Sequence, residues 1–204
     1  MAMPARHSDR SKPELQPTAD DNDPLGQLYV CHERMIRQIN ILDRLCDRLA
    51  APQTAPDKAP AAAPAGDVDP EVRAAARGIQ RYFDEVAPRH HLDEEQDLFP
   101  AVIESMAGSD ARCLHELTAQ LVREHRRLEA DWAALRPMIA TLAQGRRIDL
   151  DPRVVATFVA NHRTHLSKEN DELMPMARRL LSDQQVAEIG ANMRQRRDRA
   201  KGHS

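Results

Sequence analysis

The chain has 204 residues, which suits one domain. Apolar residues make up 41% of it, aromatic residues 3% and charged residues 30%, a composition that favours amphipathic helices over strands. The formal net charge of −3 gives no electrostatic reason to expect a nucleic acid or membrane partner, and no apolar run approaches the roughly 18 residues of a membrane span.

The sequence opens with a polar segment and then shows a first helix. Residues 1–23 contain three prolines and no periodicity, and we expect them to form a disordered tail. Apolar side chains recur at helical spacing over residues 25–49 and predict the first helix. Residues 51–69 are rich in alanine and proline, so we expect a linker there rather than a continuous helix.

The second helix begins at a strong start signal. Asp69 suits an N-cap, Pro70 suits the first helical position, and apolar residues continue at helical spacing to Leu98. We expect Pro88 to kink this helix, because proline has no amide hydrogen to donate.

Two further long helices and a shorter one follow. The third starts at Ser109 or Asp110 and ends near Gly145, the fourth starts at Asp151-Pro152 and extends to Met176, and the last covers about 183–197. Helices with no strand pattern predict an all-α fold, an up-down antiparallel four-helix bundle. The predicted bundle domain spans 24–181, and 182–204 form a short extra C-terminal helix and tail whose arginines, Arg194 to Arg199, we expect to be solvated.

One motif occurs twice in the chain. Residues 90–100 read HHLDEEQDLFP and residues 165–175 read HLSKENDELMP. Aligned on their final prolines, each copy is H-x-x-x-E followed by a short apolar run and a proline. Residues four apart lie on the same face of a helix, one turn apart. The imidazole and the carboxylate of each copy can therefore reach one inward point, as a metal ion requires.

Each of the four main helices carries a histidine where its apolar stripe calls for leucine or isoleucine. These are His32, His90, His125 and His165. A single histidine of this kind is usually a core residue, but here Glu94 and Glu169 share the inward faces. Two buried carboxylates without partners would be strongly destabilising. The pattern therefore predicts a metal site.

The number of ligands indicates two ions rather than one. If both glutamates bridge, each ion receives two imidazoles and two carboxylate oxygens, and an oxo or hydroxo bridge adds a fifth ligand. Mixed nitrogen and oxygen ligands with an open position favour two iron ions, ahead of manganese, whereas zinc more often takes a tetrahedral site. No glutamate stands three residues before any of the nine histidines, so the Glu-x-x-His pattern of ferritin-like proteins is absent.

These residues resemble the hemerythrin-like, HHE cation-binding family, and most closely its bacterial single-domain members. The resemblance covers roughly residues 25–180 and rests on the two motif copies. It implies the hemerythrin-like bundle and a non-haem di-iron centre bridged by the two motif glutamates. The ligands that it implies are His32, His90, Glu94, His125, His165 and Glu169.

The chain departs from the oxygen-carrying hemerythrins on its third helix. Those proteins have two histidines four apart there, whereas Leu121 stands four residues before His125. His91 is the leading candidate for a fifth imidazole, since some family members coordinate through the residue after the motif histidine. It lies one position off the stripe, so a ligand and a residue on the helix flank both remain open. We expect His162 to line or support the site rather than to bind metal, and Glu95 to face solvent.

The resemblance implies a protein that binds or reacts with a small oxidant, namely dioxygen, nitric oxide or hydrogen peroxide, in sensing, scavenging or stress defence. Leu121 favours reactivity, whereas ligation by His91 would favour binding. One alternative is an enzyme that disproportionates peroxide or donates iron for repair; another is a metal-free structural bundle. No protein partner is indicated. Three cysteines without C-x-x-C spacing, and the lack of a signal-peptide-like stretch, favour the cytoplasm.

Overall fold

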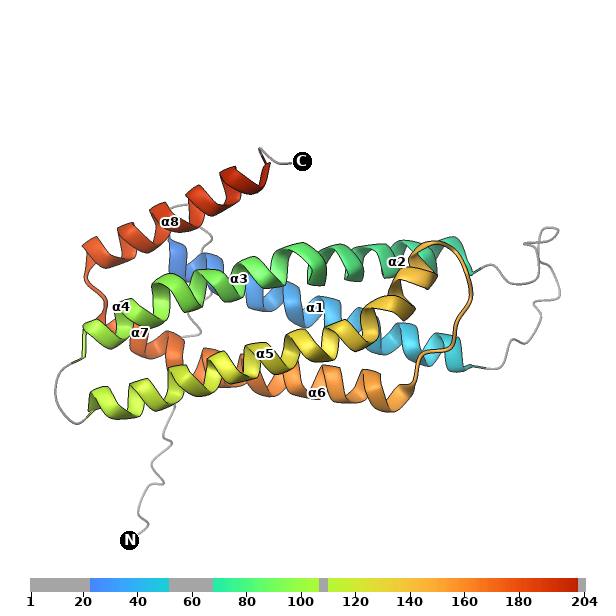
Figure 1. Ribbon diagram of the computed structural model, residues 1–204, viewed down its shortest axis with the longest axis horizontal. Coiled ribbons are helices and arrows are strands. Elements are labelled where there is room, and N and C mark those ends of the chain that lie inside the picture. Colours follow the sequence, from blue (N-terminus) through green and yellow to red (C-terminus); the bar gives the residue numbers. More distant parts are fainter. Residues whose placement is uncertain (1–22, 52–67, 107–109, 202–204) are drawn as a thin grey trace, which may run out of the picture.

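The computed structural model describes residues 23–51, 68–106 and 110–201. Four long helical rods lie side by side along the molecule, and a further helix lies at an incline over one end of them (Figure 1). The described residues contain no strand, so the predicted all-α antiparallel bundle is confirmed. The predicted tail (1–23) and linker (51–69) lie almost entirely outside the described residues.

The four rods and the additional helix have the following bounds. The first rod is α1 (Pro24–Ala50). The second joins α2 (Pro70–Arg81), α3 (Ala87–Asp93) and α4 (Phe99–Glu104) through two π-helical turns, η1 (Tyr82–Val86) and η2 (Glu94–Leu98). The third rod is α5 (Asp110–Ala143). The fourth joins α6 (Pro152–Lys168) and α7 (Met174–Leu180) through a third π-helical turn, η3 (Glu169–Leu173), and α8 (Asp183–Lys201) follows.

The helix boundaries follow the local signals in the sequence. Asp69 accepts a hydrogen bond from the Glu71 amide at 2.8 Å, and Asp151 accepts one from the Arg153 amide at 2.8 Å, so both predicted N-caps are confirmed. Just beyond the end of α5, Gly145 has a φ of +92°, a left-handed conformation that glycine adopts without steric cost.

Each of the three π-helical turns ends two residues before a proline, namely Pro88, Pro100 or Pro175. Proline donates no amide hydrogen bond, so one α-helical hydrogen bond is lost at each of these positions. The chain instead closes a wider turn, in which the amide five residues on bonds to the carbonyl of Tyr82, Glu94 or Glu169. The irregularity that we predicted at Pro88 thus takes this form, and the same feature recurs in both motif copies.

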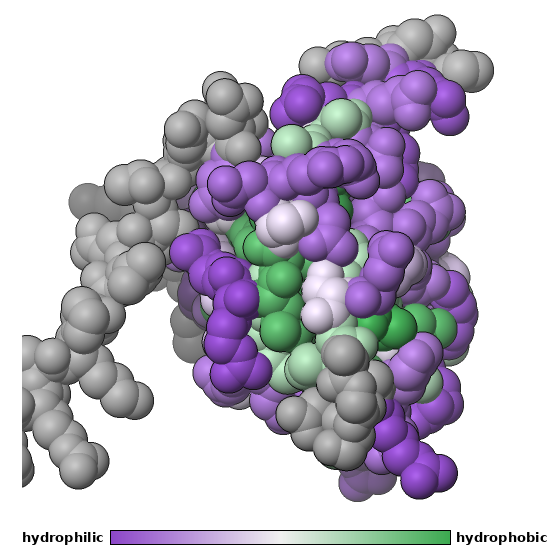
Figure 2. Space-filling view, turned by 90° about the vertical axis from the view of Figure 1, so that its left-hand side faces the viewer, coloured by the Kyte–Doolittle hydropathy of each residue, from purple (hydrophilic) through white to green (hydrophobic). Residues whose placement is uncertain are grey.

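A buried polar layer divides the apolar core of the bundle into two clusters. One cluster centres on Phe83, Trp132 and Phe158. The other occupies the opposite end, with Leu28, Leu121 and other apolar residues. Figure 2 views this second end, where apolar side chains come to the surface between polar ones. The candidate ligands lie between the two clusters along the rods.

The helix α8 packs on the bundle rather than extending away from it. Ile189 and Met193 are buried in the second apolar cluster. Arg196 bonds to Asp93 at 2.6 Å and also pairs with Asp97. The expectation of a fully solvated arginine-rich end was therefore wrong for Arg196, because acidic residues on the second rod pair with it. No helix in the described ranges is long and apolar enough to cross a membrane.

Candidate metal centre

Seven side chains from all four rods meet in the buried polar layer. They are His32 (α1), His90 and His91 (α3), Glu94 (η2), His125 (α5), His165 (α6) and Glu169 (η3). None of the seven is more than 4% exposed, so each has lost nearly all of its contact with water. The bundle thus brings together every residue that the sequence nominated as a ligand, including His91.

The seven side chains divide into two groups, each with ligand atoms within 4.8 Å of one another. The two-imidazole subsite contains His32 and His90 together with Glu94 and Glu169. The three-imidazole subsite contains His91, His125 and His165. Ligand atoms about 2.1 Å from one ion are about 3.0 Å apart at right angles and about 4.2 Å apart on opposite sides. The observed spacing is therefore compatible with one ion in each subsite.

Both carboxylates lie between the two subsites. One oxygen of Glu94 is 3.4 Å from His90 Nε2, and its other oxygen is 3.4 Å from His125 Nε2. Glu169 has one oxygen 3.3 Å from His32 Nε2 and the other 3.0 Å from His165 Nε2. Each glutamate therefore presents one oxygen to each subsite, as a bridging carboxylate does.

Most polar side-chain atoms of this layer lack hydrogen-bond partners. Within the described part of the chain, eleven buried side-chain nitrogen and oxygen atoms have none, and all eleven belong to these seven residues. Unpaired buried polar atoms are strongly destabilising and therefore rare. A set of imidazole nitrogens and carboxylate oxygens aimed at shared space is the donor set of a metal centre, so these residues fit a pair of cations.

The imidazoles and the carboxylates also stabilise one another electrostatically. Burial would lower the pKa of His125, but the Glu169 and Glu94 carboxylates outweigh it and raise the pKa to about 10. Burial and the Glu94 charge would raise the pKa of Glu169, but His165 and His125 bring it down to about 2. Burial and the neighbouring His125 and His90 hold the pKa of His91 well below its usual range. The glutamates are thus ionised and His91 is neutral, the forms that bind metal, whereas His125 has to release a proton before its Nε2 can bind a metal ion.

In three of the five histidines, the ring nitrogen that faces away from the cluster has a partner on another rod. His125 Nδ1 lies 2.8 Å from Glu95, and His165 Nδ1 lies 3.1 Å from Glu124. His32 Nδ1 lies 2.7 Å from the amide oxygen of Asn170. Such partners fix the tautomer of a ligand histidine and leave its other nitrogen free for the metal.

The expectation that Glu95 faces solvent was wrong. Its side chain is 15% exposed and lies against the His125 ring, opposite Glu94. A regular α-helix would point consecutive residues well apart, but η2 begins at Glu94, and a wider turn reduces the angle between neighbours. Sequence reasoning also missed Glu124 and Asn170. The spacing gave no signal for them, because their histidine partners come from other helices.

Two residues near the seven do not join them. His162 is buried, but it lies outside both subsites; its Nδ1 bonds to the Phe158 carbonyl at 2.9 Å, and its ring packs on Phe158 and Phe83. Burial lowers the pKa of His162 to about 4. Leu121 is fully buried in the second apolar cluster.

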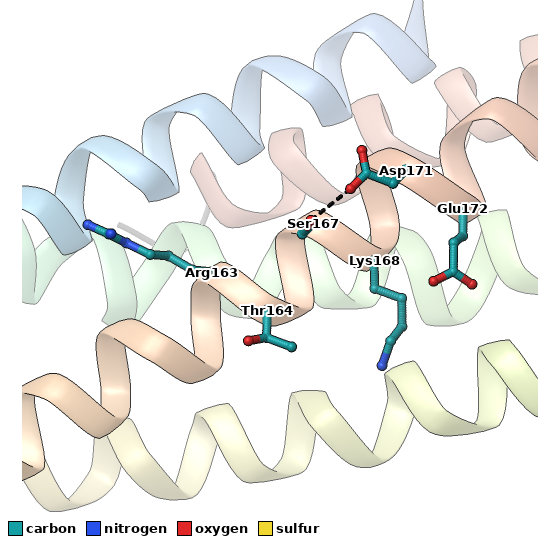
Figure 3. A pocket seen from close by; sticks show the side chains of 6 residues that line it. All are labelled: Arg163, Thr164, Ser167, Lys168, Asp171 and Glu172. Carbon is teal, nitrogen blue, oxygen red and sulfur yellow. Dashed lines mark hydrogen bonds between the residues drawn. The ribbon is translucent and has the colours of Figure 1, made fainter.

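A surface hollow of about 480 Å³ lies on the outer side of the fourth rod (Figure 3). Its lining residues are Arg163, Thr164, Ser167, Lys168, Asp171 and Glu172. They point in different directions, and Ser167 bonds to Asp171 within the hollow. Lys168 extends toward α5, where it pairs with Glu124. The hollow therefore has no converging set of donor atoms. Lys168 in its wall nevertheless contacts Glu124, the hydrogen-bond partner of His165.

The family comparison agrees with this geometry. The model of the hemerythrin HHE cation binding domain matches residues 23–177. The chain is also similar to an uncharacterised protein of Haemophilus influenzae, with 30% identity over 187 residues that cover 90% of this chain and 95% of the relative. A cation-binding domain requires buried donor atoms, which the seven residues supply. This chain belongs to the hemerythrin HHE cation-binding family.

Proposed function

We propose that the protein is a non-haem di-iron protein that binds a small oxidant, with dioxygen or nitric oxide as the first candidates. The observation that carries the proposal is the set of eleven unpaired buried atoms. Two cations would together take up nine of them, one nitrogen from each of the five imidazoles and both oxygens of each of the two glutamates. In this proposal His32, His90, Glu94 and Glu169 hold one ion. His91, His125 and His165 hold the other, with the second oxygens of the two glutamates.

The unequal number of imidazoles in the two subsites favours binding of the small oxidant at one of the two ions. The three-imidazole subsite has one more nitrogen donor than the two-imidazole subsite, so the open position belongs to the latter. His91 supplies the imidazole that Leu121 does not: its ring stacks on that of His125 at 4.0 Å between centroids. This favours binding over the peroxide-consuming alternative, which depends on a less saturated centre.

The protein chain holds the donor atoms in position and excludes water from them. Two apolar clusters flank the polar layer, so bulk water does not compete for the donor atoms. The outer partners of the histidines hold the rings in place from neighbouring rods. Two iron ions held there would supply the open coordination position and the electrons that a small oxidant takes up.

We further propose that the protein works in the cytoplasm. Cys31, Cys46 and Cys113 are all free thiols in the structure, which fits a reducing compartment.

The test is the visible spectrum of anaerobically reduced, iron-loaded protein, recorded while air is admitted and then removed. A charge-transfer band that appears and disappears reversibly is the expected result. The same cycle with nitric oxide in place of air shows which diatomic molecule the centre favours.

Two other outcomes have distinct meanings. A band that forms with air and stays would indicate irreversible oxidation and would move the assignment to peroxide chemistry. A protein that retains no iron after loading, while its circular dichroism shows a folded bundle, would refute the di-iron proposal and leave the metal-free alternative.

A further inference from the structure

The two subsites differ in the groups behind their histidines. In the three-imidazole subsite, carboxylates stand behind His125 and His165, namely Glu95 at 2.8 Å and Glu124 at 3.1 Å. In the two-imidazole subsite, His32 has the neutral amide of Asn170. His90 lies beside the thiol of Cys31 rather than a carboxylate. Among the described residues, outer carboxylates therefore lie behind the three-imidazole subsite only.

Both outer carboxylates are anchored by cations. Glu95 pairs with Arg126 at 2.5 Å through the oxygen that does not face His125. Glu124 pairs with Lys168 in the same manner, while its other oxygen faces His165. Each arrangement is a chain of cation, carboxylate and imidazole that starts near the surface and ends at the three-imidazole subsite. The cations fix the carboxylates in the orientation that the histidines require.

The shared ligands do not offset this difference. Each of Glu94 and Glu169 gives one oxygen to each subsite, so the bridging charge is divided equally. A carboxylate that accepts the Nδ1 proton makes the opposite nitrogen a stronger donor, and losing such a partner typically costs 10- to 100-fold in metal affinity. The outer carboxylates therefore increase the metal affinity of the three-imidazole subsite, as the additional imidazole of His91 does.

We propose that Glu95 and Glu124 are positioning residues that make the three-imidazole subsite the tighter of the two, so that it fills first. This inference rests on the proposed metal centre. It concerns the order and affinity of loading, and it assigns a role to two carboxylates that do not themselves reach the ions.

The test is a calorimetric titration of chelator-stripped, full-length protein with Co²⁺, followed in parallel by visible absorption. We expect two binding steps in the unaltered chain. Glu95→Gln and Glu124→Gln each keep the side-chain shape and an acceptor oxygen but remove the charge. Each should weaken the first step by about 10- to 100-fold and leave the second step within about 3-fold.

Three further variants separate positioning from general effects. Glu116→Gln, an exposed residue on the same helix as Glu124, changes the net charge equally without touching an imidazole, and it should alter neither step. Asn170→Asp places a carboxylate behind His32 and should tighten the second step by about 10-fold. His90→Ala should remove the second step and retain the first, which identifies the subsites.

The outcomes distinguish this inference from the proposed function. If the unaltered protein binds no Co²⁺, the metal centre itself is refuted. If it binds Co²⁺ in two steps, but the Glu95 and Glu124 variants match Glu116→Gln or weaken both steps equally, only the positioning role is overturned. Circular dichroism of each variant shows that the bundle is intact.

Discussion

Replacing His162 tests whether a buried histidine on the same stripe as the ligands has a purely structural role. It is 2% exposed, and its contacts are Phe83, Phe158 and a backbone carbonyl rather than the seven residues of the metal centre. His162→Leu keeps an apolar side chain of similar size on the helix. We therefore expect the variant to bind the same amount of metal as the unaltered protein.

The same substitution should change how stability depends on pH. The unfolded chain protonates His162 below about pH 6.5, whereas burial delays protonation in the folded chain to a pKa of about 4. The unfolded state thus binds more protons between these values, and stability is lost as the pH falls through them. At about 1.4 kcal/mol per pH unit, the full loss is about 3 kcal/mol, of which about 2 kcal/mol is reached by pH 5.

The assay is urea denaturation followed by circular dichroism at pH 8 and pH 5, with chelator in all samples. At pH 8 the variant should lose about 1 kcal/mol with the hydrogen bond to Phe158. Between pH 8 and pH 5 it should lose about 2 kcal/mol less than the unaltered protein, so the order of stability reverses. His115→Leu, at an exposed position, is the matched control. Equal pH dependence in all three proteins would refute the reasoning.

Three other substitutions test the site and the core. Glu94→Ala should lose metal and most of the stabilisation by saturating metal, about 3 kcal/mol at 100-fold excess over Kd. In chelator it should also be less stable than the unaltered protein, because His90 and His125 lose the carboxylate that balances their charge; thermal melts with and without metal check both effects. His91→Ala should lose the ion of the three-imidazole subsite and retain the other, and unchanged metal content by elemental analysis would place His91 outside the ligand set. Phe83→Ala removes a ring that packs 5.0 Å from Phe158 and 5.2 Å from Trp132, and should cost about 3–5 kcal/mol in urea denaturation, with a loss under 1 kcal/mol contradicting its place in the core.

The sequence by itself determined the features that lie within one helix. Helical spacing of apolar residues predicted the rods, and Asp69 and Asp151 marked two helix starts that the structure confirms. The four-residue spacing from His90 to Glu94 brings both side chains to one face of the second rod. All of these depend on neighbours along the chain, whose geometry the helix itself imposes.

Only the tertiary structure decided which side chains from different rods face one another. It brought His91 onto His125, and it brought Glu124 to His165, a residue 41 positions further along the chain. It also showed that Glu95 lies against His125 rather than in solvent, because a π-helical turn occurs where the sequence suggested a regular helix. Such contacts depend on the register and rotation of packed helices. These are set by the sum of many weak side-chain contacts across the bundle, and the periodicity of a single helix contains no record of them.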